Sequence, residues 1–364
     1  MKKHKILFVH PSLGLGGAEK IIAFLANSVS EKYEVSFLSL KNNEKTLILN
    51  EKIRYICKPS YSEKPIFGKQ MVSGIKDLIK VGRIIKNTIK TEQADLVICF
   101  DLRVLLAVNM VKINSKVLFS ERADPYANPQ YWKFLLNRFY KKIDYIVFQT
   151  EAAQAFYGDS VKKKSAIIPN PALMRIDSAV RRNPSNSQNY IFAAGRLQYR
   201  KGFDLLVNAF IKIASKHPET ELWIYGEGEE KSKLITTINN SCYKDRVRLL
   251  NPINGVIEKN IQSRLFVIPS RSEGIPNILI EAMVAGIPCV ATDCSPGGAK
   301  LLSENGKYCI LAKNDDVESL ASKLDYALSH SCEMEKQALN ALKSMKRFDK
   351  EIIASKWLSV IENI

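Results

Sequence analysis

The sequence predicts an α/β protein made of two doubly wound, Rossmann-like domains, and three observations support that fold class. Short apolar runs alternate with longer segments of helical periodicity, the pattern of strands that are buried on both faces and joined by helices. The pattern lapses over residues 171–189, a stretch rich in Pro, Ser and Asn, and then restarts. At 364 residues the chain is long enough for two domains. We expect a first domain at 1–170, a linker at 171–189 and a second domain at 190–349, facing each other across a cleft.

The first half of the chain should form a sheet with helices between its strands. Its apolar runs are short, as in Val97-Ile98-Cys99-Phe100, and most are followed by a segment of helical period. The expected strands are 5–10, 33–40, 53–57, 94–100, 116–120, 144–150 and 166–169. The expected helices are 17–30, 69–90, 103–112, 130–142 and 151–157.

The second half repeats this alternation. Its expected strands are 190–194, 221–225, 246–250, 265–269, 289–292 and 308–311. Its expected helices are 202–216, 229–239, 277–285, 316–329 and 333–345. A last helical segment at 350–361 is detached from the final strand, so we expect residues 350–364 to pack back on the first domain.

The positive charge is concentrated in the first half. The chain has 54 Lys and Arg against 37 Asp and Glu, a net charge of +17. Residues 1–170 hold 28 Lys and Arg and 15 Asp and Glu, or +13, whereas 171–189 and 190–364 hold +2 each. A hydrophobic content of 46% and a charged content of 25% exclude disordered and fibrous classes. The excess of positive charge indicates a polyanionic partner, and both nucleic acid and an anionic membrane surface are consistent with it.

Targeting and cysteine signals are weak. No apolar stretch approaches the ~18–20 residues that span a bilayer, and the start of the chain lacks the features of a signal peptide. We therefore expect a cytoplasmic protein. The seven cysteines are odd in number and form no C-x-x-C pair, so we interpret them as reduced core thiols and expect no disulfide framework or metal cluster.

Three segments that follow strands carry candidate binding residues. The first is a Gly-rich turn in which Gly14, Gly16 and Gly17 precede a helix, so that backbone N–H groups can approach a phosphate. It lacks the dinucleotide fingerprint, because Glu19 stands where that motif needs a third glycine. Taken alone, the turn fits tight packing equally well.

The second segment, 193–202, contains Gly195, Arg196, Lys201 and Gly202 directly after a buried strand. Doubly wound sheets bind ligands at this end of their strands. A planar guanidinium and a compact ammonium suit a diphosphate. The alternative is a pair of solvated surface cations.

The third segment, 269–288, carries two carboxylates. Glu273 lies in a loop, and Glu281 lies in the second turn of an otherwise apolar helix that begins near Asn277. A carboxylate in such a place needs hydrogen-bond partners, and sugar hydroxyls are natural ones. The alternative is a structural glutamate bonded to the backbone.

Together these residues resemble the motifs of the retaining glycosyltransferases of family 4, over almost the whole chain. The matching residues are Gly16-Gly17-Ala18-Glu19, Gly195-Arg196-Leu197 with Lys201-Gly202, Tyr225-Gly226-Glu227-Gly228, and the pair Glu273 and Glu281 in an E-x7-E spacing. The resemblance implies a GT-B fold, with the acceptor on the first domain and the nucleotide sugar on the second.

The same resemblance implies roles for individual residues. Arg196 and Lys201 would hold the donor diphosphate, Glu281 the ribose hydroxyls and Glu273 the transferred sugar. The other donor-binding residues that it implies are Gly16, Gly17, Gly195, Gly274, Ile275, Pro276, Asn277 and Ile278. Many relatives have a histidine near the transferred sugar where this chain has Arg122, so we include Arg122 among the catalytic candidates with its role open.

The expected mechanism follows from charge. The leaving group is a nucleoside diphosphate, whose developing negative charge must be stabilised. Because the chain contains no D-x-D motif, Arg196, Lys201 and helix N-terminal amides would do this without a metal. We expect transfer with retention, no cofactor and no metal ion.

A basic amphipathic pattern at 69–90 indicates where the enzyme works. Met71, Ile75, Leu78, Ile85 and Ile89 fall on one helical face. The opposite face carries the cations Lys69, Lys76, Lys80, Arg83 and Lys90. Such a helix is typical of a membrane surface, although it can equally pack its apolar face in a core and leave its cations solvated.

These expectations combine into one hypothesis. The protein would move a hexose or N-acetylhexosamine from a nucleotide sugar, with UDP as the expected nucleoside diphosphate. The acceptor would be a polyprenyl-diphosphate-linked glycan in bacterial surface polysaccharide synthesis. It would work at the anionic inner face of the cell membrane and bind no nucleic acid. The alternatives are a GT-B epimerase or hydrolase, a dinucleotide-dependent oxidoreductase and, from another class, a basic nucleic-acid-binding protein.

Overall fold

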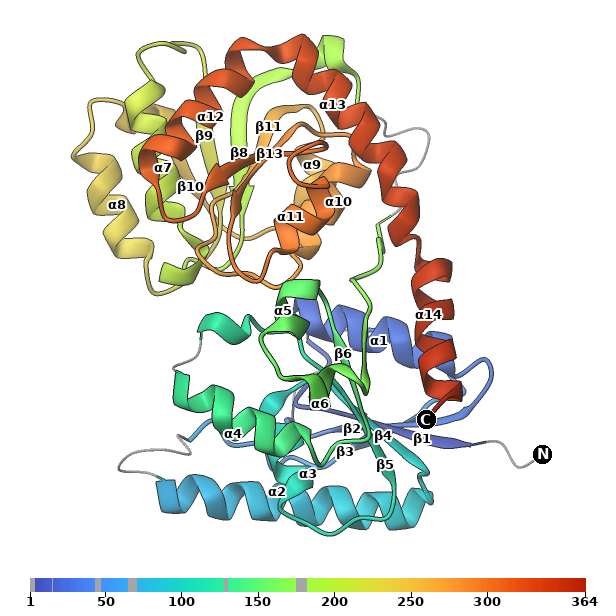
Figure 1. Cartoon of the computed structure of the whole chain (residues 1–364). Coiled ribbons are helices and arrows are strands. Elements are labelled where there is room, and N and C mark those ends of the chain that lie inside the picture. Colours follow the sequence, from blue (N-terminus) through green and yellow to red (C-terminus); the bar gives the residue numbers. More distant parts are fainter. Residues whose placement is uncertain (1–3, 15, 43–46, 65–70, 128–129, 175–181) are drawn as a thin grey trace. The chain divides into compact units, whose positions relative to one another are not determined.

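The chain forms two compact α/β units, which we describe separately. The computed structural model describes residues 4–14, 16–42, 47–64, 71–127, 130–174 and 182–364. The first unit comprises Met1–Asn170 and Glu351–Ile364, and the second comprises Pro171–Lys350 (Figure 1).

The first unit is built on a parallel sheet. In its described residues, seven strands pair in the order β3-β2-β1-β4-β5-β6-β7. The strands are β1 (Lys5–His10), β2 (Glu34–Ser39), β3 (Arg54–Cys57), β4 (Leu96–Cys99), β5 (Lys116–Ser120), β6 (Tyr145–Phe148) and β7 (Ser165–Ile167). The strand order reverses between β1 and β4, which is the point where doubly wound sheets bind ligands beyond the carboxyl ends of their strands.

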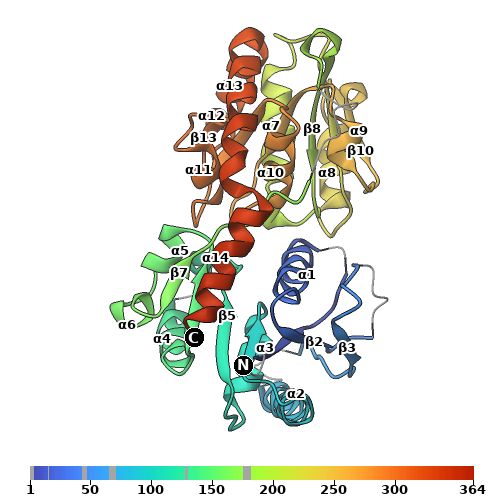
Figure 2. The ribbon, with the colours of Figure 1, turned by 90° about the vertical axis from the view of Figure 1, so that its right-hand side faces the viewer.

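Helices cover both faces of this sheet. Figures 1 and 2 show α1 on one side and α2 with α3 on the other. The helices are α1 (Gly17–Val29), α2 (Met71–Glu92), α3 (Leu102–Asn109), α4 (Gln130–Tyr140), α5 (Glu151–Ala155), α6 (Asp159–Lys162) and α14 (Lys350–Glu362). Leu78 and Ile85 of α2 are buried in one core cluster with Leu7 and Val9 of β1, so the apolar face of this amphipathic helix packs inside the unit.

The last helix belongs to the first unit although it follows the second unit in the sequence. Trp357 of α14 is fully buried. Its ring stacks on Phe100, which directly follows β4, at a centroid distance of 5.9 Å. The last helix therefore packs on the first unit, as the sequence predicted, and the stacking of Trp357 on Phe100 is one of the contacts that hold it there.

The second unit has the same architecture. In its described residues, six parallel strands pair in the order β10-β9-β8-β11-β12-β13. They are β8 (Gln188–Ala194), β9 (Glu221–Tyr225), β10 (Val247–Leu250), β11 (Ser263–Ile268), β12 (Cys289–Asp293) and β13 (Ile310–Lys313). The order reverses between β8 and β11. The helices are α7 (Phe203–Ile213), α8 (Lys231–Asn239), α9 (Val256–Lys259), α10 (Asn277–Val284), α11 (Gly298–Ser303), α12 (Val317–Ser329) and α13 (Ser331–Ser344).

Several elements differ from the sequence expectation. The short helices α6, α9 and α11 were not expected, because four to six residues are too few to show a helical period. Helix α3 starts at Leu102 rather than 103, because the Asp101 carboxylate caps it by accepting a hydrogen bond from Val104 N at 2.9 Å.

The stretch expected to be a linker is part of the second unit where it is described. Ala172 N donates to Phe348 O at 2.7 Å. The Arg182 guanidinium pairs with Glu335 and donates to Ile261 O at 3.0 Å. The Arg182 side chain is buried by these contacts, which the Pro-, Ser- and Asn-rich composition of the stretch does not reveal. Residues 175–181 lie outside the described residues.

The cysteine expectation was only partly correct. All seven thiols are free, and Cys99, Cys289, Cys294 and Cys309 are buried as expected. Cys57, Cys242 and Cys332 are exposed, so the expectation of core thiols was wrong for these three. Cys57 ends β3, a strand at the edge of the first sheet that is only partly covered.

Among the described residues, no helix has the length and apolar character needed to cross a membrane.

Candidate active site

The sequence-predicted donor residues of the second unit gather at the point where its strand order reverses. Gly195 and Arg196 directly follow β8, and Glu273 lies in the loop that follows β11. Strands β8 and β11 are neighbours in the sheet. Because the carboxyl ends of parallel strands meet at one edge, both loops rise from the same edge of the sheet.

A glycine lets these two loops touch. Gly202 has φ +68°, and a Cβ at this position would lie 2.0 Å from the carbonyl oxygen of Pro269, just past β11. Only glycine combines this left-handed backbone with so close an approach. The turn that carries Lys201 therefore packs directly against the start of the Glu273 loop.

The contact brings Lys201 and Glu273 together. The Lys201 ammonium forms an ion pair with the Glu273 carboxylate. The Arg200 guanidinium lies 3.8 Å from the same carboxylate and donates to Ser272 O at 2.9 Å. The Lys201 and Glu273 side chains are 21% and 17% exposed. The ion pair is therefore partly protected from solvent but remains accessible to a ligand. The alternative of freely solvated cations is therefore wrong for Lys201.

Arg271 holds the Glu273 loop in place. The sequence did not identify it as a candidate site residue. Its guanidinium makes two hydrogen bonds to the Asp204 carboxylate, of 2.7 and 2.6 Å, and one to Asp315 of 2.6 Å. It also lies over the Tyr199 ring, 4.0 Å from the centroid. Its backbone N–H donates to Arg200 O at 2.9 Å. Burial has the largest single effect on the pKa of Asp204 and would raise it, but the hydrogen bonds and positive charge of Arg271, together with backbone hydrogen bonds, give a net lowering.

The motif residues 274–281 form the loop end and the first turns of α10. Gly274, Ile275 and Pro276 are buried, and α10 begins at Asn277. The first turn of a helix presents N–H groups that have no acceptor within the helix, which suits a phosphate or a sugar oxygen. Glu281 lies one turn after Asn277 and Ile278, and all three are partly exposed. Glu281, which the sequence predicts to bind the ribose, therefore lies on the same face of α10 as Asn277 and Ile278, whose backbone N–H groups are predicted to face phosphate or sugar.

A third loop approaches the same place. A Cβ on Gly298, at the start of α11, would lie 1.8 Å from Gly274 O. Glu273 N donates to Ser295 O at 3.1 Å. The Gly-rich turn after β12 therefore packs against the Glu273 loop, and its small residues permit that packing.

The candidates of the first unit follow β1 and β5. Gly16 caps α1 and, like Gly17, is exposed at the start of this 13-residue helix. The Arg122 guanidinium lies 4.4 Å from the Phe100 ring centroid and 5.6 Å from that of Trp357, and it donates to Asn170 Oδ1 at 2.5 Å. Burial lowers the pKa of Arg122 to about 9. Arg122 therefore packs against Trp357 of α14 and helps to hold this last helix in place. The sequence did not predict this contact.

The basic face of α2 lies on the outside of the first unit. Lys76, Lys80, Arg83 and Lys90 are exposed, opposite the buried face. Lys69 lies outside the described residues. Among those that are described, no group of three or more His, Cys, Asp or Glu side chains could hold a metal ion.

Comparison with known proteins agrees with this arrangement. The family model described as "Glycosyl transferases group 1" matches residues 176–345. A protein of Haemophilus influenzae named "Uncharacterized glycosyltransferase" is 28% identical over 344 residues, covering 90% of this chain and 91% of the relative. A Campylobacter jejuni protein is 22% identical and covers 99% of both chains. It is named "GalNAc-alpha-(1->4)-GalNAc-alpha-(1->3)-diNAcBac-PP-undecaprenol alpha-1,4-N-acetyl-D-galactosaminyltransferase".

Solved structures show the same fold. The crystal structure of Anabaena Alr3699/HepE in complex with UDP and glucose aligns with a TM-score of 0.80 at 17% identity, over 99% of this chain and 100% of the other. Sucrose-phosphate synthase from Thermosynechococcus elongatus aligns with a TM-score of 0.81 at 15% identity, over 99% of each chain. With two parallel-sheet units and these relatives, the chain is a glycosyltransferase of the GT-B fold.

Proposed function

We propose that the protein transfers a hexose or N-acetylhexosamine, with retention, from a UDP-sugar to a lipid-linked saccharide during bacterial surface polysaccharide synthesis. The observation that carries the proposal is the cluster of Lys201, Arg200 and Glu273 at the strand-order reversal of the second unit. Two relatives from Campylobacter jejuni have names that specify undecaprenol-linked acceptors, which supports the acceptor class. The UDP complex of the Anabaena protein supports the donor class.

In this proposal, the second unit binds the donor. The diphosphate lies against Arg196, Lys201 and the first turn of α10, where positive charge and N–H groups offset the negative charge that develops on the leaving oxygen. Glu281 accepts hydrogen bonds from the ribose hydroxyls, and Glu273 accepts them from the transferred sugar. No metal is needed for this charge balance.

The chemical step breaks the bond between the anomeric carbon and the diphosphate oxygen. The acceptor hydroxyl attacks on the face that the diphosphate leaves, and the departing phosphate oxygen takes the hydroxyl proton. The products are an extended glycan of unchanged anomeric configuration and a nucleoside diphosphate. Lys201 remains beside the departing oxygen, and Glu273 keeps Lys201 oriented through their ion pair.

The test is to replace Glu273 by Gln. This change keeps the size of the side chain but removes the charge that pairs with Lys201. We expect transfer to fall by about 100-fold or more, with an unchanged unfolding temperature, measured as UDP release over a panel of UDP-sugars. The matched control is Glu318→Gln, whose 76%-exposed carboxylate pairs with Lys212 on the surface. Near-normal transfer by the Glu273 variant would contradict the assignment.

A further inference from the structure

The chain passes between the two units twice, and the two crossing segments are paired with each other. The crossing segments are residues 170–172 and 348–351. Ala172 N donates to Phe348 O at 2.7 Å, and Ala172 also pairs with Asp349 in an isolated parallel bridge. Any change in the orientation of one unit relative to the other must therefore bend both segments together.

Arg122 contacts the first-unit side of both crossing segments. It lies two residues after β5, at the carboxyl edge of the first sheet. Its Nη1 donates to Asn170 Oδ1 at 2.5 Å, and Asn170 is the last residue of the first unit before the chain crosses. The guanidinium also lies 5.6 Å from the ring centroid of Trp357, in the helix α14 that begins at the second crossing. One side chain thus joins the candidate acceptor edge to both crossings.

The guanidinium of Arg122 is buried without a counter-charge. In the part of the chain that the structure describes, it pairs with no carboxylate, and its Nε and Nη2 have no hydrogen-bond partner. The rings of Phe100 and Trp357 offset part of this cost. Replacing an unpaired buried charge by an apolar side chain often stabilises a protein. Stability alone therefore does not explain an arginine at this position.

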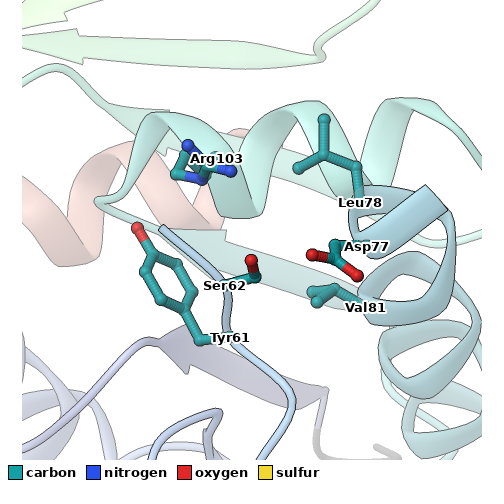
Figure 3. Close-up of a pocket in the computed structure, with 6 residues that line it drawn as sticks. All are labelled: Tyr61, Ser62, Asp77, Leu78, Val81 and Arg103. Carbon is teal, nitrogen blue, oxygen red and sulfur yellow. The ribbon is translucent and has the colours of Figure 1, made fainter. Parts of the chain in front are cut away.

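A second arginine of the first unit shows how such an atom is ordinarily satisfied. Arg103 Nε also lacks a partner among the described residues. Arg103 lines a small pocket that has room for about one water molecule (Figure 3), and water can accept from this N–H. The pocket is lined by Tyr61, Ser62, Asp77, Leu78, Val81 and Arg103. The Arg122 guanidinium instead lies against aromatic rings, which offer no oxygen.

We propose that Arg122 is a positioning residue for glycosyl transfer, which fixes both crossing segments to the first sheet and so limits the orientations that the two units adopt. Its unpartnered donors are buried, so it acts through Asn170 and Trp357 and does not touch the reacting atoms. The inference rests on the proposed function, in which the acceptor lies on the first unit and the donor on the second. A misplacement of about 1 Å between reacting groups can cost about 100-fold in rate.

The first test uses the ligand-free protein. Dyes are attached to Cys57 in the first unit and Cys242 in the second, which are free and exposed, after the exposed Cys332 is changed to Ser. Single-molecule energy transfer between the dyes measures the range of distances between the units. In Arg122→Met this range should widen about twofold, because the hydrogen bond to Asn170 is lost. An unchanged distribution would overturn the inference, whether or not the protein transfers a sugar.

The second test separates stability from transfer. Methionine keeps the apolar packing on Phe100 and Trp357 and removes the unpaired charge, so Arg122→Met should unfold at the same temperature as the parent or at a higher one. Its kcat should nevertheless fall about tenfold, whereas the KM for the UDP-sugar should not change, because the donor binds to the second unit. A parallel loss of unfolding temperature and kcat would assign Arg122 a purely structural role and overturn the inference.

A double-mutant cycle tests the route through Asn170. Asn170→Ala should also widen the distance distribution and lower kcat, and adding Arg122→Met to it should cause little further loss. Fully additive losses would contradict the inference. Arg54→Met is the matched control, because this guanidinium on β3 is 68% exposed and pairs with Glu92, and it should behave like the parent. A wider distribution in Arg122→Met, together with no transfer by the parent from any UDP-sugar, would uphold the inference and contradict the proposed function.

Discussion

The Lys201 ammonium and the Glu273 carboxylate form an ion pair between the loops that follow β8 and β11, where the strand order of the second sheet reverses. These residues are 72 positions apart in the sequence. Gly202 makes the contact possible, because a side chain there would collide with Pro269 O. In the proposed function, a bound diphosphate would share Lys201 with Glu273, so donor binding would be coupled to the position of the Glu273 carboxylate.

Arg271 should control donor affinity without touching the donor. Arg271→Lys keeps the charge but loses the paired hydrogen bonds to Asp204 and the contact with Asp315. We expect about a tenfold loss of UDP-sugar affinity, measured by calorimetry, because the loop that carries Glu273 is less well held. The control is Arg248→Lys, whose exposed guanidinium pairs with Glu221. Equal affinity in both variants would show that Arg271 does not position the loop.

Trp357 should anchor the last helix to the first unit. The side chain is fully buried and stacks on Phe100. Trp357→Ala should lower the free energy of unfolding by about 3–5 kcal/mol in urea titrations, because it leaves a large cavity. Ile352→Ala, on the same helix but 45% exposed, should cost far less. A comparable small loss for both would contradict the anchoring role.

The basic face of α2 should bind anionic membranes. Changing Lys76, Lys80 and Arg83 to Glu should weaken binding to phosphatidylglycerol vesicles by more than 100-fold at low salt, since each basic residue near an anionic surface contributes about 1 kcal/mol. Sedimentation with vesicles measures this. Changing three exposed lysines of the second unit, Lys212, Lys216 and Lys233, to Glu provides the charge-matched control. Equal losses would indicate a net-charge effect, and no loss would remove the membrane role of α2.

Glu121 should make stability depend on pH. Its buried carboxyl accepts hydrogen bonds from Tyr140 and Tyr157, but burial outweighs them and raises the pKa of Glu121. A carboxyl with a raised pKa in the folded state retains more protons than in the unfolded state, so stability falls as pH rises from the unfolded value of about 4.3 through the raised value.

Glu121→Gln removes this titration. Relative to the parent, the variant should therefore gain unfolding temperature as pH rises across that window. Thermal unfolding of both proteins at a series of pH values measures the difference. A difference that stays constant with pH would contradict the direction of the shift.

The sequence predicted most of the fold, and it predicted the loops and the helix on which the candidate site residues of the second unit lie. The strand at 5–10 and the start of the helix at 277 agree with β1 and α10, because apolar runs and a loop before an apolar helix leave clear local signals. The pair Glu273 and Glu281 was likewise visible, since its spacing lies within one loop and helix.

What could not be predicted depends on contacts between distant residues. Arg271 reaches Asp204 and Asp315, 67 and 44 positions away, and such ion pairs have no periodic signature. The packing of Arg122 on Trp357 joins the loop after β5 to the last helix of the chain.

The central claim is that protein cations, rather than a metal ion, stabilise the leaving diphosphate. The most direct measurement is transfer from a UDP-sugar in excess EDTA, with the anomeric configuration of the product read by NMR. We predict full activity with retention in the parent and, in Lys201→Met, a loss of at least about 100-fold that magnesium does not restore. Loss of parent activity in EDTA, followed by recovery on adding magnesium, would contradict the account.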